Sequence, residues 1–143
     1  MSETPQKQKP VPWGKVKQYA QRWRERLSLR DWDLDLHRVE DRLLGVPDGN
    51  VGLANAYVET DSETMKATIG IATLRDERDV ERSVAHEMAH ICLTELRDVM
   101  KSISEETSPS AANAVERLWD VAEERAAHRI ARALMTTEYR DDD

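Results

Sequence analysis

The 143-residue chain contains one cysteine and no long apolar segment. A single cysteine, Cys92, excludes an internal disulfide framework and is typical of a reducing compartment. No apolar run approaches the roughly 20 residues that span a bilayer, and the polar start of the chain lacks the apolar core of a signal peptide. These absences predict a cytoplasmic protein without membrane contact.

The net charge of −7 conceals an asymmetry between the two parts of the chain. Residues 1–30 hold eight basic and two acidic side chains, so they carry +6 and the remainder carries −13. A basic helix of this kind can meet nucleic acid or an acidic partner. The simpler interpretation is that the arginines lie on the exposed side of a first helix and offset the acidic body, because no base-reading motif accompanies them.

Apolar spacing predicts one α+β domain over residues 13–137, between a basic, proline-rich tail at 1–12 and an acidic tail at 138–143. At 16.4 kDa there is room for one hydrophobic core. The expected elements, in chain order, are a helix at 13–29, strands at 31–37, 53–59 and 66–73, a helix at 79–96, a polar connection at 97–108, and a long helix from 109 to about 135. We expect the strands to form a small antiparallel sheet with the helices gathered on one face.

The segment His86-Glu87-Met88-Ala89-His90 matches the H-E-x-x-H motif of zinc hydrolases. It falls on the expected helix at 79–96, for which Asp79 is the predicted N-cap. Because a helical turn takes about 3.6 residues, the two histidines share one side and can reach a single metal ion. The core side is predicted to carry an apolar stripe of Val80, Val84, Met88, Ile91 and Cys92. The motif therefore predicts one zinc ion held by His86 and His90, with Glu87 as the general base for a zinc-activated water.

A catalytic zinc needs a third protein ligand, and no histidine follows the motif at the spacing of the three-histidine enzymes. A glutamate from a later helix is the known alternative. Glu123 and Glu124 compete for this role on the last predicted helix. Glu124 shares its face with small and apolar residues, whereas Glu123 shares its face with further acidic residues. The helical period therefore favours Glu124 and leaves Glu123 as the alternative.

These residues resemble the minimal gluzincin metallopeptidases, including the ImmA/IrrE family of small bacterial and phage proteases. The motif of the chain is followed by Glu124-x-x-Ala127-x-x-Ile130-Ala131-x-x-Leu134-Met135, which is similar to the zinc-binding glutamate helix of that family. The resemblance covers roughly residues 30–136. It implies a zincin-like fold, His86, His90 and Glu124 as zinc ligands, Glu87 as base, a protein or peptide substrate, and a possible regulatory protein partner.

The sequence does not decide which group stabilises the oxyanion or which strand binds the substrate. His128, one turn after Glu124, and Tyr57, on a predicted strand, are the two oxyanion candidates. Zincins that this chain resembles pair an extended substrate with an edge strand. That edge is expected either around Ala54 and Ala56 or along residues 67–72.

Two functions other than zinc-dependent endopeptidase also fit the sequence. A non-catalytic binding module could retain zinc for stability alone, in which case replacement of Glu87 would have no effect. A DNA-associated protein could use the basic first helix, with Lys15, Lys17, Arg22 and Arg24 making salt-dependent contacts. Endopeptidase is favoured because Glu87 occupies the base position and contributes nothing to simple retention of zinc.

Overall fold

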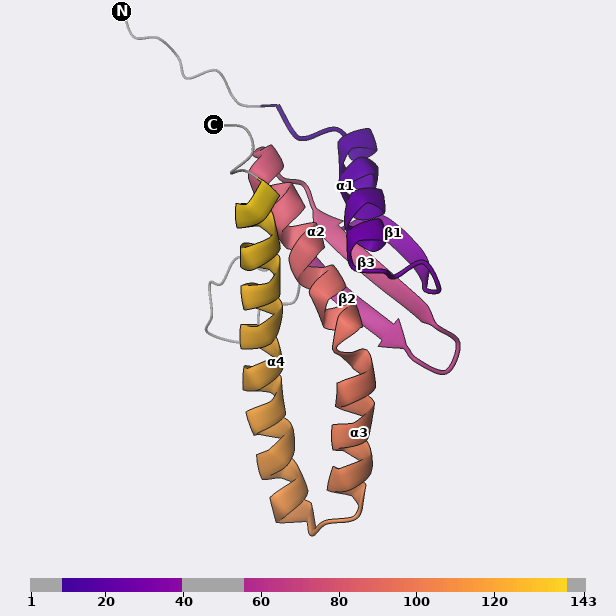
Figure 1. Ribbon diagram of the computed structural model, residues 1–143, viewed down its shortest axis with the longest axis vertical. Helices are drawn as coiled ribbons and strands as arrows, with labels where there is room; N and C mark the ends of the chain where they lie inside the picture. Colours follow the sequence, from indigo (N-terminus) through magenta and orange to yellow (C-terminus); the bar gives the residue numbers. More distant parts are fainter. Residues whose placement is uncertain (1–8, 40–55, 139–143) are drawn as a thin grey trace, which may run out of the picture.

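The computed structural model describes residues 9–39 and 56–138, which form an α+β fold (Figure 1). The predicted turn at 45–50, Ala54 and residues 139–143 of the acidic tail predicted at 138–143 lie outside the described residues. The described elements are α1 (Trp13–Arg26), β1 (Asp33–Val39), β2 (Ala56–Asp61), β3 (Lys66–Ala72), α2 (Glu77–Cys92), α3 (Thr94–Glu105) and α4 (Pro109–Glu138). None of these helices is both long enough and apolar enough to cross a membrane.

The sheet is mixed, so the predicted all-antiparallel sheet is wrong in one pairing. The strand order is β1-β3-β2, with β2 antiparallel and β1 parallel to β3. The β2–β3 hairpin was predictable, because strands joined by a short turn are antiparallel neighbours. In this turn the Asp61 carboxylate accepts hydrogen bonds from the backbone N–H groups of Glu63 and Thr64. A long connection separates β1 from β2, and alternation of side chains does not specify a partner strand or its direction.

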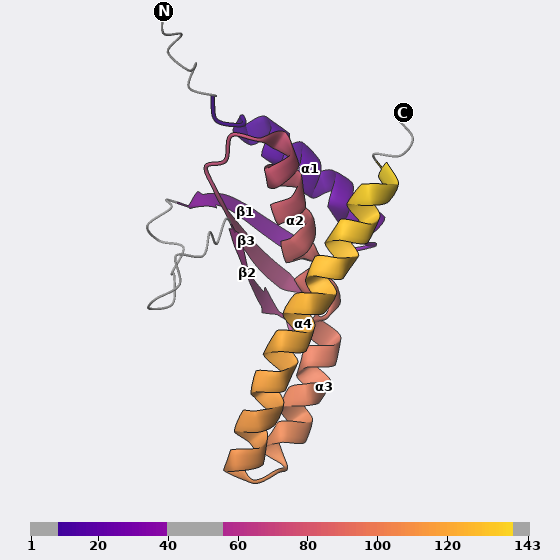
Figure 2. The same cartoon turned by 90° about the vertical axis from the view of Figure 1, so that its left-hand side faces the viewer.

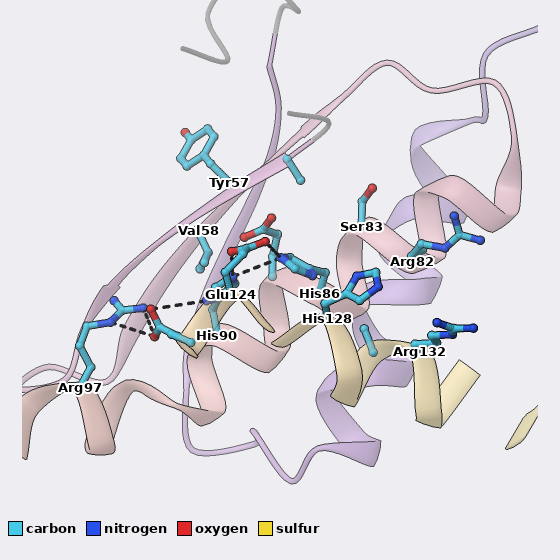
Figure 3. Close-up of a pocket in the computed structure, with 14 residues that line it drawn as sticks. Tyr57, Val58, Arg82, Ser83, His86, His90, Arg97, Glu124, His128 and Arg132 are labelled. Carbon is cyan, nitrogen blue, oxygen red and sulfur yellow. Dashed lines mark hydrogen bonds and ion pairs between the residues drawn. The ribbon is translucent and has the colours of Figure 1, made fainter. Parts of the chain in front are cut away.

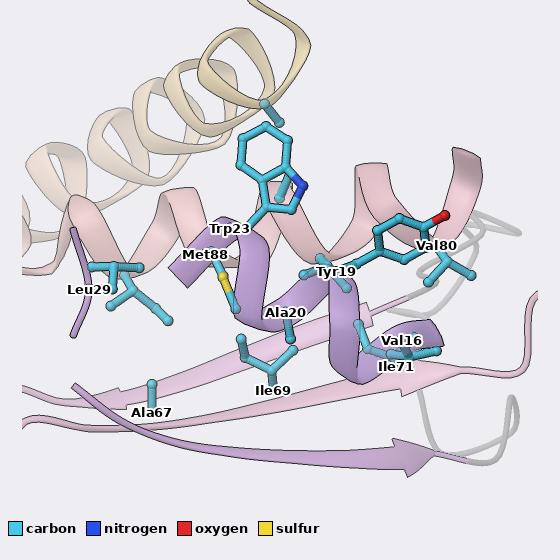
Figure 4. Close-up of a cluster of buried hydrophobic side chains, with 14 of the residues drawn as sticks. Val16, Tyr19, Ala20, Trp23, Leu29, Ala67, Ile69, Ile71, Val80 and Met88 are labelled. Carbon is cyan, nitrogen blue, oxygen red and sulfur yellow. The ribbon is translucent and has the colours of Figure 1, made fainter. Parts of the chain in front are cut away.

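Helices α1 and α2 cover one face of this sheet (Figure 2). The core lies between the two layers, and Figure 4 shows Trp23 and Met88 from the helices above Ile69 of β3. All three side chains are at most 1% exposed. Helix α1 turns Val16, Tyr19, Ala20 and Trp23 toward this core, where all four are buried. Val11 is also buried and its N–H donates to the carbonyl of Leu74 at 2.8 Å, so the folded part of the chain begins before residue 13.

Helix α2 differs from the prediction at both ends. It begins earlier, because the carboxylate of Asp76 accepts from the N–H groups of Arg78 and Asp79; the N-cap is therefore Asp76 and not Asp79. It ends at Cys92, where a turn at Leu93 separates it from α3. The stripe of Val80, Val84, Met88 and Ile91 is buried as predicted, but Cys92 is exposed at the end of the helix instead of lying in the core.

The predicted polar connection at 97–108 is wrong, because most of it forms helix α3. Thr94, Met100 and Ser104 are the buried residues of this helix, which packs against α4. Together α3 and the first half of α4 project beyond the sheet as a two-helix arm (Figures 1 and 2). The pattern Leu96, Val99, Met100 and Ile103 has helical spacing, but three of these four apolar side chains are exposed. The helical spacing of these apolar residues indicated a helix, and a prediction from the polar composition of the segment overlooked it.

Helix α4 begins where predicted, at Pro109, and continues to Glu138. The side-chain oxygen of Ser108 accepts from the N–H of Ala111 at 3.4 Å, as expected of the residue before the helix. Its buried positions recur every four residues at Glu123, Ala127, Ala131 and Met135. This stripe packs the second half of α4 against α2 and the core.

A buried polar contact fixes α1 to the helix that carries the H-E-x-x-H motif. Nε1 of Trp23 donates to a carboxylate oxygen of Glu81 at 3.1 Å, and both residues are at most 1% exposed. The same carboxylate oxygen lies 3.5 Å from Arg22. A buried indole N–H that loses its acceptor leaves an unsatisfied donor in the core.

We predict that Glu81→Ala lowers the free energy of unfolding by about 2–3 kcal/mol, because it leaves the Trp23 N–H unpaired and opens a cavity. Glu81→Gln keeps an oxygen acceptor and should lose less. Chemical denaturation of both variants measures the difference. Equal stability of the two variants would contradict the assigned role of the Trp23–Glu81 contact.

Candidate metal centre

Three potential metal ligands from two helices converge at one point in the structure (Figure 3). His86 and His90 lie one turn apart on α2, and Glu124 comes from α4. The Nε2 atoms of the two histidines are 3.2 Å apart. One oxygen of the Glu124 carboxylate lies 2.8 Å from His86 Nε2, and the other lies 3.1 Å from His90 Nε2.

These distances fit a tetrahedral zinc site. Ligand atoms about 2.0–2.1 Å from a tetrahedral ion are about 3.3 Å apart from one another. The closest separations among the three groups, 2.8, 3.1 and 3.2 Å, are within about 0.5 Å of that value. Two imidazoles and one carboxylate are also a donor set that catalytic zinc sites use, with a fourth position left open. The residues present can therefore hold one zinc ion.

The protonation of the site also suits metal binding. Burial lowers the pKa of His86, although the Glu124 carboxylate opposes this shift. A lowered pKa keeps the imidazole neutral near pH 7, which is the form that ligates a metal. Glu87 is 8% exposed, and burial together with the negative charge of Glu124 raises its pKa to about 7. A carboxyl group with this pKa can both accept and release a proton near neutral pH.

The two competing glutamates have different partners in the structure. Glu123 is buried, and its Oε1 accepts from Nε of Arg97 at 2.9 Å and from a second guanidinium nitrogen of Arg97. Its other oxygen lies 3.8 Å from Nδ1 of His90, on the opposite side of that ring from Glu124. Glu123 is thus committed to Arg97 and faces the outer nitrogen of His90, while Glu124 faces both inner nitrogens. The geometry favours Glu124 as ligand.

The reason given for Glu124 in the sequence analysis is only partly correct. We expected Glu124 to share a packed face with Ala127 and Ala131 of α4. Those two alanines are buried, but the buried stripe passes through Glu123, and the Glu124 side chain is 63% exposed. Glu124 therefore lies at the margin of the packed face. A ligand at the margin reaches the metal position while it remains open to solvent and substrate.

The three groups lie in a cleft of about 820 Å³ between α2, α4 and β2. Ala56, Tyr57 and Val58 of β2 line one wall, and Glu87 lies in the same cleft as the three candidate ligands. Strand β2 is at the edge of the sheet, whereas residues 67–72 belong to the central strand. Of the two predicted substrate-binding edges, the structure places the one that includes Ala56 in the cleft with the three candidate ligands.

The two oxyanion candidates occupy different positions. The hydroxyl of Tyr57 points away from the three ligands in Figure 3 and lies 2.7 Å from Nε2 of His37 on β1. Its ring crosses Gly70, where an added Cβ would lie 2.2 Å from the ring. His128 lines the cleft, and its ring centre is 6.4 Å from that of His86. His128 is therefore better placed than Tyr57 to contact a bound substrate.

Three basic residues of the cleft were not predicted from the sequence, namely Arg82, Arg97 and Arg132. Arg97 lay in the segment predicted to be a loop. Helical spacing could have found the other two, because Arg82 precedes His86 by four residues and Arg132 follows His128 by four. Exposed arginines on a helix are usually assigned to the solvent-facing side, so neither residue was assigned to the cleft.

Comparison of the chain with protein-family models, with curated proteins and with solved structures gives no match.

We predict that Glu87 makes the stability of the metal-free protein fall as the pH rises. Its pKa is about 7 when folded, above its ordinary value of 4.5, so the folded state binds more protons than the unfolded state between these values. Stability is therefore lost as the carboxyl ionises through this window. Relative to Glu87→Gln, the wild type should lose about 1–3 kcal/mol between pH 5 and pH 8. Denaturant titrations in a chelator test this, and a constant difference would refute it.

Proposed function

We propose that this protein is a zinc-dependent endopeptidase. The observation that carries the proposal is the convergence of His86, His90 and Glu124 on one point, in a cleft that also contains Glu87. Zinc in this position would polarise a peptide carbonyl and lower the pKa of a water molecule to roughly 7. A simple structural zinc site would not need an ionisable carboxyl group beside it.

The chain itself supplies the proton transfer and the positioning. The Glu87 carboxylate accepts the proton that the attacking water loses and then donates it to the leaving nitrogen. Glu123, which Arg97 holds in place, faces Nδ1 of His90 and restricts the orientation of that ring. His128 offers a hydrogen bond to the negative oxygen that develops on the carbonyl carbon.

An extended peptide can bind along β2 in this proposal. An edge strand presents unpaired backbone groups, and a peptide that pairs with them gains affinity from its main chain. Ala56 and Val58 place small to medium side chains along the cleft, so they leave room for a substrate backbone. This arrangement agrees with the substrate binding implied by the resemblance to the gluzincins, and the open cleft suits cleavage within a chain.

Nucleic-acid binding through α1 is less well supported, because three of its arginines have structural contacts. Arg24 donates to the carbonyl oxygens of Leu29, Arg30 and Trp32. The guanidinium of Arg22 lies near Glu81 and over the Tyr19 ring, and that of Arg26 lies over the Trp23 ring. These contacts give the arginines roles within the fold, which favours the simpler interpretation that they lie on the first helix without a nucleic-acid partner.

We predict that the zinc-loaded protein cleaves members of a proteome-derived peptide library and that Glu87→Gln lowers the rate by at least about 100-fold while zinc is retained. Mass spectrometry of the products measures cleavage, and metal analysis confirms that zinc remains bound. Glu105→Gln, an exposed glutamate at the end of α3, makes the same charge change and should cleave at the wild-type rate.

Two results would contradict the proposal. Cleavage that survives in Glu87→Gln would remove the proposed base. A zinc-bound protein that unfolds on chelation but cleaves no peptide would support the non-catalytic binding module instead.

A further inference from the structure

The cleft continues beyond the three candidate ligands into a basic end. Arg82 of α2 and Arg132 of α4 line the same cleft as His86 and Glu124. Figure 3 shows both guanidinium groups on the same side of the cleft, on the far side of His86 and His128 from Arg97. Two arginines from different helices therefore border one end of the cleft in a protein whose net charge is −7.

Helix geometry explains why these two arginines are neighbours. Helices α2 and α4 pack against each other in opposite directions, and the rings of His86 and His128 face each other across the groove. Arg82 lies one turn before His86, and Arg132 lies one turn after His128. Because the helices are antiparallel, the position one turn before His86 on α2 lies beside the position one turn after His128 on α4.

The acidic residues that line the cleft lie toward its other parts. Glu124 faces the two histidines, and Glu123 pairs with Arg97. Glu87 is largely buried beside the candidate ligands. Arg82 does face Asp79, but the two groups are 3.8 Å apart and both are more than half exposed. Such an exposed pair contributes little and can be exchanged for a better anion.

We propose that Arg82 and Arg132 form a subsite for a carboxylate of the peptide substrate. A guanidinium group binds carboxylates through paired N–H donors, and two such groups at the same end of a cleft favour an anion over a neutral side chain. The subsite lies about 6 Å along the helices from the metal centre, since four helical residues rise by that distance. An extended peptide advances about 3.3 Å per residue, so the carboxylate belongs about two residues from the bond that is cleaved.

This inference deepens the proposed endopeptidase function and rests on it only for the assignment of the ligand to a substrate. A carboxylate can come from an aspartate or glutamate side chain or from the C-terminus of a peptide. The two sources share the same chemistry, and blocked and unblocked peptides distinguish them.

Fluorescence anisotropy of labelled peptides in a chelator tests the subsite without catalysis. The probes are a serine- and alanine-rich decapeptide with two central glutamates and blocked ends, its glutamine counterpart, and the glutamine counterpart with a free C-terminus. We expect at least about fivefold tighter binding of one or both carboxylate-bearing peptides than of the blocked glutamine peptide. The preference should fall below about twofold in Arg82→Gln/Arg132→Gln.

Arg78→Gln/Arg125→Gln is the matched control, because it removes the same charge from the same two helices at positions outside the cleft. This control should keep the full preference. Equal binding of all three peptides, or a preference that survives in Arg82→Gln/Arg132→Gln or disappears in the control, would overturn the subsite.

Cleavage by the zinc-loaded protein is measured separately on the same peptides. If the arginine-dependent preference is present and no peptide is cleaved, the subsite stands and the endopeptidase proposal fails. If peptides are cleaved without any preference for a carboxylate, the endopeptidase proposal stands and the subsite fails.

Discussion

The close packing of α2 against α4 brings the three candidate metal ligands together. The two helices pack together, and both bury small side chains: Ala85 and Ala89 on α2 and Ala127 and Ala131 on α4 are all at most 2% exposed. Small residues let two helix axes approach closely, and the approach brings Glu124 within 3.1 Å of both histidine Nε2 atoms. Longer side chains at these positions would separate the carboxylate from the imidazoles.

The rest of the fold holds these two helices in place. The sheet and α1 bury the apolar stripe of α2, and the contact between Trp23 and Glu81 limits its rotation. On the other side, the α3–α4 arm contributes Arg97, which fixes Glu123 next to His90. Several polar groups are therefore buried near the centre, and each buried charge requires a partner. Glu81 and Glu123 have such partners. Glu87 has its pKa raised to about 7 instead, mainly by burial.

Local sequence patterns predicted much of this arrangement. Periodic apolar residues located α1, α2 and α4, and the spacing of His86 and His90 placed both on one side of a helix, as the structure has them. The preference for Glu124 over Glu123 agrees with the geometry, although the stated packing reason was incomplete. These features could be predicted because they depend on the helical period and on the chemistry of single residues.

The errors concern features that depend on contacts between distant segments. The direction of β1 is set by its pairing with β3, and nothing in its own alternation encodes a parallel neighbour. Helix α3 is an exception, because the helical spacing of its apolar residues is a local signal that the polar composition of the segment outweighed in the prediction. Arg97, the partner that distinguishes Glu123 from Glu124, was missed with it. Arg82 and Arg132 became neighbours only once the antiparallel packing of α2 and α4 was known.

The most direct test of the metal centre is the zinc content of the purified protein after zinc loading and desalting, measured by mass spectrometry for the wild type and three single variants. The account predicts about one zinc per wild-type chain, loss of zinc in His86→Ala and Glu124→Ala, and retention in Glu123→Ala with an affinity about 10- to 100-fold lower, since Glu123 only orients His90. A wild type that takes up no zinc, or zinc that survives in Glu124→Ala and is lost in Glu123→Ala, would contradict the account.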